Sequence, residues 1–122
     1  MLFSEVDKHV TIYDQLKEEG GGPVILINVF TVKPEEADEL MAAWADDAAY
    51  MKRQPGFIST QLRRGIGGSG AFLNYAVWRS VEHFRQAFEN LDFRAKLNHY
   101  PASAAASPHL FRKAAIPGIC VA

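Results

Sequence analysis

From residue 72 to residue 84 the chain has the sequence Phe72-Leu73-Asn74-Tyr75-Ala76-Val77-Trp78-Arg79-Ser80-Val81-Glu82-His83-Phe84. Aromatic and β-branched residues that follow a glycine-rich segment and end at a serine predict a strand leading into a helix. Alternation puts Asn74 and Trp78 on one face of this strand, together with Phe72 and Ala76. An asparagine among apolar side chains needs a hydrogen-bond partner, and a ligand is one way to supply it. This face is therefore the first place to look for a functional site.

The segments on either side of this stretch complete a regular pattern. The nearly continuous apolar run 24–32 predicts a buried strand whose one strongly polar member is Asn28. Pro34 and an apolar stripe from Ala37 to Met51 predict a helix, and residues 57–64 predict a second strand joined to the third by the glycine loop 65–70. Ser80 is expected to cap a second helix. A short helical piece over 92–98, a loop over 102–108 and a fourth strand over 109–115 follow.

The order β-α-β-β-α-β predicts an α+β, ferredoxin-like fold. We expect the strands 24–32 and 72–78 to be parallel neighbours at the centre of the sheet. Asn28 and Asn74 would then form a polar spot in an apolar pocket, although alternation does not say whether they share a face. Two helices cover only one face of such a sheet. Pairing with a second copy is the simplest way to bury the other face, so a homodimer is expected.

Length and composition limit the alternatives. The 122 residues suit one domain, here residues 23–122 with an apolar C-terminal tail, preceded by an N-terminal arm over 1–22 that ends in Gly20-Gly21-Gly22-Pro23. The net charge of −1 and the scattered basic residues disfavour nucleic-acid binding. A lone cysteine, Cys120, and the lack of a signal peptide or a long apolar run predict a cytoplasmic protein without a membrane partner.

Three motifs over about residues 24–115 resemble the antibiotic biosynthesis monooxygenase superfamily. They are the opening strand from Asn28 to Lys33, Pro55-Gly56-Phe57 before the second strand, and the strand and turn that run from Asn74 to Phe84. The resemblance implies a dimeric α/β barrel built from two ferredoxin-like protomers. It also implies an oxidoreductase, although one fold can serve several reactions.

Two branches of that superfamily offer a mechanism. The resemblance to the first implies a cofactor-independent monooxygenase that oxidises a small aromatic, anthrone- or quinol-like phenol with dioxygen. The asparagine and tryptophan of that branch fall on Asn74 and Trp78, whereas its helix tyrosine falls on Phe84 and its arginine near Asn98. The haem-degrading branch matches at Asn28 and Trp78, but its histidine falls near Leu97. Because His99, two residues on, faces another side of a helix, we expect no haem, flavin or metal. The other alternative is a non-catalytic, small-ligand-binding dimer.

The candidate site residues follow from these matches and from the faces of the strands. We expect Asn74, Trp78 and His99 to be catalytic, with His99 as base because imidazole titrates near neutral pH. Asn74 could instead be a structural amide, and Trp78 could belong to the core. The four histidines lack metal-ligand spacing, and most are expected at the surface. The expected substrate-binding residues are Asn28, Phe30, Phe72, Phe84 and Phe88.

Overall fold

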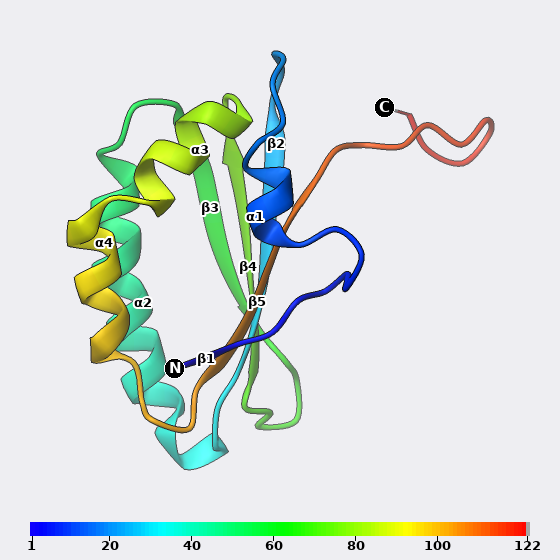
Figure 1. The fold of residues 1–122 in the computed structure, drawn as a ribbon. Helices are drawn as coiled ribbons and strands as arrows, with labels where there is room; N and C mark the ends of the chain where they lie inside the picture. Colours follow the sequence, from blue (N-terminus) through cyan, green and yellow to red (C-terminus); the bar gives the residue numbers. More distant parts are fainter. Residues whose placement is uncertain (122) are drawn as a thin grey trace.

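The computed structural model describes residues 1–121 (Figure 1). Its elements are β1 (Leu2–Phe3), α1 (Ile12–Gln15), β2 (Val24–Thr31), η1 (Pro34–Glu36), α2 (Ala37–Lys52), β3 (Phe57–Arg64), β4 (Ala71–Trp78), α3 (Val81–Phe88), α4 (Leu91–Lys96), η2 (Leu97–His99) and β5 (Ala105–Phe111). Within these residues the strands form one open sheet of order β1-β5-β2-β4-β3. Helices α2, α3 and α4 lie on one side of this sheet. The predicted α+β, ferredoxin-like fold is confirmed.

The direction of the central strands differs from the prediction. β2 and β4 are neighbours, but they are antiparallel, as are β2 and β5. The reason is the hairpin: the crossover through α2 makes β3 run parallel to β2, and the tight turn then reverses β4. Because β4 lies between β2 and β3, it is antiparallel to both. The register pairs Asn28 directly with Asn74, so the two side chains share a face.

Local sequence explains how β3 and α3 begin. Gly56 has a φ of +86°, and a side chain there would collide with the imidazole of His83. The hydroxyl of Ser80 accepts a hydrogen bond from the backbone N–H of His83, which caps α3 as expected. The Pro55-Gly56-Phe57 motif and the start of α3 therefore pack against each other. His83 has a structural role in this contact.

The last strand starts and ends four residues earlier than predicted. Residues 105–108, which were predicted to be a loop, belong to β5, and residues 112–115 do not. Ala106 pairs with Phe30 and is fully buried, so small side chains are needed here beneath a large ring. Pro108 is tolerated because β1 pairs only with Ala105 and Ala106, which leaves the rest of β5 at the edge. The pairing stops at Phe111 because its partner Ile25 lies one residue from the start of β2.

The N-terminal arm packs against the sheet and the helices. β1 pairs parallel with β5, and a capping box at Thr11 starts α1. Ile12 and Leu16 are buried in the core. The side chain of Gln15 donates to the carbonyl of Leu110 and accepts from its backbone N–H, which ties α1 to β5.

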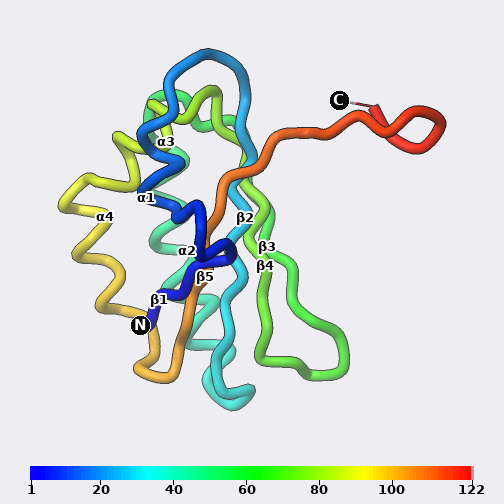
Figure 2. The backbone as a smooth tube through the Cα atoms, turned by 45° about the vertical axis from the view of Figure 1, so that its right-hand side comes forward, coloured from blue at the N-terminus to red at the C-terminus, as the bar shows by residue number. Residues whose placement is uncertain are grey.

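The C-terminal tail extends away from the body of the protomer (Figure 2). Ile116 and Cys120 form an isolated bridge, and the side chains of Ile119 and Val121 are exposed. An apolar tail is expected to pack either on its own domain or on a second copy of the chain; it does not pack on its own domain, and packing on a second copy stays a prediction. The last residue of the predicted tail, Ala122, lies outside the described residues.

Two groups of buried side chains fill the space between the sheet and the helices. One is rich in aromatic rings and includes Trp78, Phe84 and Phe88. The other contains Phe30 and Tyr100. The candidate site lies where the two groups meet. Among residues 1–121, no helix has the length and apolar character needed to span a bilayer.

Candidate active site

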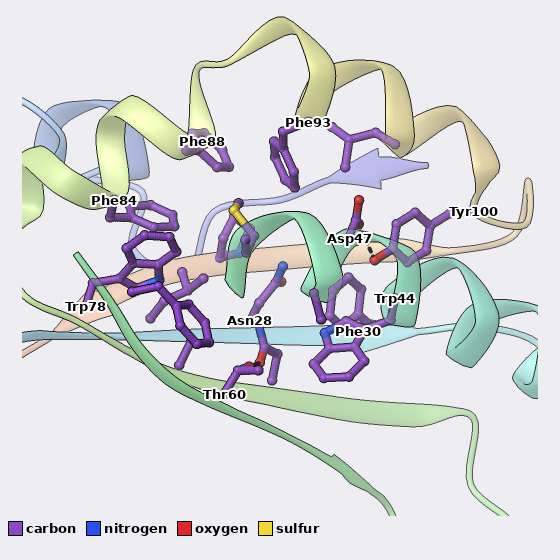
Figure 3. A pocket seen from close by; sticks show the side chains of 18 of the residues that line it. Asn28, Phe30, Trp44, Asp47, Thr60, Trp78, Phe84, Phe88, Phe93 and Tyr100 are labelled. Carbon is purple, nitrogen blue, oxygen red and sulfur yellow. Dashed lines mark hydrogen bonds between the residues drawn. The ribbon is translucent and has the colours of Figure 1, made fainter. Parts of the chain in front are cut away.

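A cavity of about 60 Å³ lies between the sheet and helices α2, α3 and α4 (Figure 3). Because a water molecule needs roughly 10–15 Å³ of such space, the cavity has room for only a few waters and must widen to admit an aromatic ligand. Trp78 and Phe84 stand at one end, Trp44 and Tyr100 stand at the other, and Asn28 lies between them. The predicted polar spot within an apolar pocket is therefore present.

Three polar side chains of the sheet, Asn28, Thr60 and Asn74, form the floor of this cavity. The Oδ1 atom of Asn74 accepts a hydrogen bond of 2.6 Å from the hydroxyl of Thr60. The Oδ1 atom of Asn28 accepts one of 3.0 Å from the backbone N–H of Ser107. Among residues 1–121, neither amide nitrogen has a hydrogen-bond partner. The floor therefore offers two N–H₂ groups, side by side, as donors to a ligand.

Trp78 is both core and cavity wall. Its side chain is buried and makes edge-to-face contacts with Phe57 and Phe84 at centroid distances of 5.5 and 5.7 Å. The indole also lines the cavity. Its Nε1–H is buried and has no partner within residues 1–121. The structural and functional interpretations of this residue are thus compatible.

Two residues that the sequence analysis missed, Asp47 and Tyr100, form the roof of the cavity. The hydroxyl of Tyr100 donates a hydrogen bond of 2.6 Å to Oδ2 of Asp47, and both residues are only 6% exposed. The other carboxylate oxygen, Oδ1, is buried without a partner among the described residues. The roof therefore contains a buried acceptor atom that none of the described residues occupies.

Burial decides the protonation of this pair. It raises the pKa of Asp47 to about 6, since an ionised carboxylate is costly away from water. Burial and the adjacent Asp47 also raise the pKa of the Tyr100 phenol, which stays protonated and donates. At neutral pH the cavity thus holds an ionised carboxylate that is more basic than an exposed one.

The sequence did contain a signal for Asp47. It lies three residues after Trp44 and four before Met51, within the apolar stripe of α2, and all three side chains line the cavity. A carboxylate on a buried stripe is itself a candidate functional group. Tyr100 carried no comparable signal, because it follows the last helical turn in an irregular segment.

The structure brings most of the predicted site residues together, but not all. Asn74, Trp78 and four of the predicted contact residues line the cavity: Asn28, Phe30, Phe84 and Phe88. Phe72 does not line it and is buried beneath the guanidinium of Arg64. His99 does not line it either: its side chain is 64% exposed and lies 3.7 Å from Asp46.

The histidines are not all at the surface. His109 is buried, and its Nε2 lies 3.1 Å from the side-chain nitrogen of Gln15 in the arm. Within the described residues, no three His, Cys, Asp or Glu side chains lie close enough together to hold a metal ion.

The family profile and the sequence relative of this chain both belong to monooxygenases. The profile of the antibiotic biosynthesis monooxygenase family matches residues 23–97. Deoxynogalonate monooxygenase of Streptomyces nogalater is 36% identical over 70 residues, which is 57% of this chain and 58% of that enzyme. The match therefore spans less than two thirds of that relative.

Solved structures agree over a longer range. SnoaB, a cofactor-independent oxygenase from Streptomyces nogalater, has a TM-score of 0.69 and 27% identity, over 80% of this chain and 98% of its own. The crystal structure of a putative monooxygenase from Shewanella loihica PV-4 also has a TM-score of 0.69 and 29% identity. This match covers 80% of the present chain and 100% of the Shewanella chain. Because the family profile covers more than half of the residues, this chain belongs to the antibiotic biosynthesis monooxygenase family.

Proposed function

We propose that this protein is a cofactor-independent monooxygenase that oxidises a small aromatic phenol, of the anthrone or quinol type, with dioxygen. The observation that carries this proposal is the floor of the cavity, where Asn28 and Asn74 hold two free amide donors between aromatic walls. The cofactor-independent oxygenase SnoaB, as a structural relative, supports the same chemistry.

The overall reaction needs no external reductant. For an anthrone, the ring methylene and one molecule of dioxygen give a ring carbonyl and one molecule of water. The substrate supplies all four electrons, one oxygen atom enters the product, and the other leaves as water. The protein then has two tasks: to favour the electron-rich anion of the substrate and to keep bulk water away from it.

The residues of the cavity suit these tasks. Asn74 and the indole N–H of Trp78 are proposed to donate to the anionic substrate oxygen, with Asn28 beside them as a second amide donor. Phe30, Phe84 and Phe88 are proposed to contact the aromatic rings of the substrate. His99 and Phe72 have no role in this proposal, because neither lines the cavity.

A homodimer belongs to the same proposal. On the sheet face opposite the cavity, Val29 is exposed, and its cross-strand partner Leu73 and the diagonal neighbour Tyr75 are half-buried. Together with the apolar tail, this face fits a second copy of the chain. Light scattering is expected to give twice the protomer mass of 13.6 kDa. A stable monomer at micromolar concentration would contradict the dimer.

Oxygen uptake tests the proposed reaction. With 1,8-dihydroxyanthrone and no added flavin or metal, we expect uptake in about a one-to-one ratio, with one labelled oxygen atom from heavy dioxygen in the product. Uptake no faster than in buffer, together with ligand-dependent quenching of tryptophan fluorescence, would instead support a binding protein. A sharp Soret band on hemin titration that His99→Ala abolishes would support haem degradation.

A further inference from the structure

Asp47 is a buried carboxylate inside the candidate site, and the chemistry above assigns it no role. We propose that Asp47 is the catalytic base, which accepts the proton of the substrate's acidic C–H or O–H group, and that Tyr100 positions it. This inference rests on the proposed function, because it names the base for the same site. It replaces the sequence-based prediction of His99.

The geometry separates the two oxygens of the carboxylate. Oδ2 is occupied by the 2.6 Å hydrogen bond from the Tyr100 hydroxyl. Oδ1 is buried and has no partner within residues 1–121, and the residue lines the cavity. The ring of Tyr100 is itself fixed by stacking on Phe30, with a centroid distance of 5.7 Å and an interplanar angle of 10°. One oxygen is therefore held and the other is free to accept a proton.

The roof and the floor face the cavity from opposite sides. Asp47 comes from α2, whereas Asn28 and Asn74 come from the central strands (Figure 3). A flat substrate between them would have its oxygen at the amide donors and an acidic hydrogen on the side of the carboxylate. Both interactions favour the anion, since the donors stabilise its charge and the acceptor removes its proton.

The charges around Asp47 suit a base at neutral pH. Burial raises its pKa to about 6, and Asp46 on the same helix adds to the rise. The hydrogen bond from Tyr100 and the charges of Lys96 on α4 and His99 on η2 lower it. The carboxylate is thus ionised at neutral pH, while its proton affinity is closer to that of the substrate than an exposed aspartate's would be.

The proton balance closes over one turnover. Asp47 takes the first methylene proton, and the resulting anion passes one electron to dioxygen. The two radicals join in a C–O bond, and Asp47 returns its proton to the distal oxygen, which gives a hydroperoxide. The second C–H bond and the O–O bond then break, so that the carbon becomes a carbonyl and hydroxide leaves with the proton as water. At the end of the turnover the carboxylate of Asp47 is again ionised.

Proton abstraction can be tested apart from oxidation. Without oxygen and in heavy water, the wild-type protein is expected to speed exchange of the methylene hydrogens of 1,8-dihydroxyanthrone, followed by nuclear magnetic resonance. Asp47→Asn should slow this exchange by about 100-fold or more. The neighbouring exposed variant Asp46→Asn is the matched control, expected within about twofold of wild type. Binding of 1,8-dihydroxyanthraquinone should be nearly equal in all three proteins, which shows that the cavity is intact.

The pH profile distinguishes a base from a structural residue. Wild-type kcat/KM should fall as pH drops through about 6, and this limb should be absent in Asp47→Asn. The hydrogen bond from Tyr100 lowers the pKa of Asp47. Tyr100→Phe removes this bond, so the pKa should rise and the limb should move to higher pH. Equal exchange rates in wild type and Asp47→Asn would overturn the proposal even if the protein consumes oxygen. Exchange without oxygen uptake would keep the base and reject the monooxygenase, and no exchange by wild type would reject the base.

Discussion

The floor and the roof of the cavity are built from different elements and bear different costs. On the floor, the carbonyls of Asn28 and Asn74 are satisfied by neighbouring donors, and only their amide nitrogens face the cavity. On the roof, Asp47 keeps one carboxylate oxygen buried and without a partner within residues 1–121. Burying a neutral amide whose carbonyl is hydrogen-bonded costs little folding free energy, whereas a buried charge lowers stability unless it is paired. If Asp47 is the proposed base, the roof keeps an unpaired carboxylate oxygen at a cost in stability that the floor does not have.

The largest expected effect of a single substitution lies on the floor. Asn74→Ala removes a donor to the developing anion and should lower kcat by about 100-fold or more, as measured by oxygen uptake with an anthrone. Asn28→Ala should also lower kcat, and it should destabilise the fold because the backbone N–H of Ser107 loses its acceptor.

Thr60→Val is the matched control for this prediction. It leaves the amide of Asn74 in place but removes the hydroxyl that orients it, so a loss of only about tenfold in kcat is expected. If Asn74→Ala kept its kcat within about threefold of wild type, the floor would not be an anion site.

On the roof, removing the charge should increase stability. The pKa of Asp47 is raised from 3.8 to about 6 in the folded protein, so folding favours the protonated form. Below about pH 4 the residue has little effect; the wild type loses stability as the pH rises from about 4 to about 6, and above that range the loss stays constant at about 3 kcal/mol. Asp47→Asn can still accept the hydrogen bond of Tyr100 and has no charge to bury. Urea unfolding should therefore show the variant to be more stable at about pH 8, with the advantage vanishing near pH 4.

Asp46→Asn provides the comparison. Asp46 is exposed at the helix surface and bonded to Lys96, which lowers its pKa, so its removal should not stabilise the protein at high pH. A stability advantage of Asp47→Asn that did not depend on pH would mean that the gain comes from packing, and the cost assigned to the roof would be wrong.

The same contrast separates what the sequence could predict from what it could not. Side chains on a strand alternate strictly, so the sequence alone was enough to assign Asn74 and Trp78 to one face. The direct pairing of Asn28 with Asn74 could not be assigned in this way, because register and strand direction depend on the hairpin and the crossover. The limits of β5 were missed for the same reason: its pairing with β2 outweighs the low strand propensity of alanine and proline.

The roof was hidden for a different reason. Asp47 lies on a helical stripe that was interpreted as purely apolar, and Tyr100 meets it from a segment 53 residues later. Contacts of this kind depend on how helix and loop pack together, and no local pattern encodes them. His99, chosen for its chemistry alone, lies at the surface beside Asp46. A residue chosen for its side-chain chemistry was therefore predicted less well than residues chosen for their position on a strand face.

The smallest expected effect concerns the arm, which closes the cavity from the side of β5. Met1 and Phe3 line the cavity, although the matched family region begins only at residue 23. Phe3 belongs to β1, which is only two residues long, and its side chain is 51% exposed. Phe3→Ala should therefore widen the cavity at little cost in stability, less than about 1 kcal/mol. KM should change by a fewfold for a bulky anthrone, with kcat unchanged.

Leu2→Ala tests whether this effect comes from the cavity. Leu2 belongs to the same short strand and is 74% exposed, but it does not line the cavity. A change in KM for Phe3→Ala alone would show that the arm takes part in substrate selection, because Leu2→Ala truncates a side chain of the same strand outside the cavity. Equal changes in the two variants would trace the effect to loss of β1, and the floor and roof would then select the substrate without the arm.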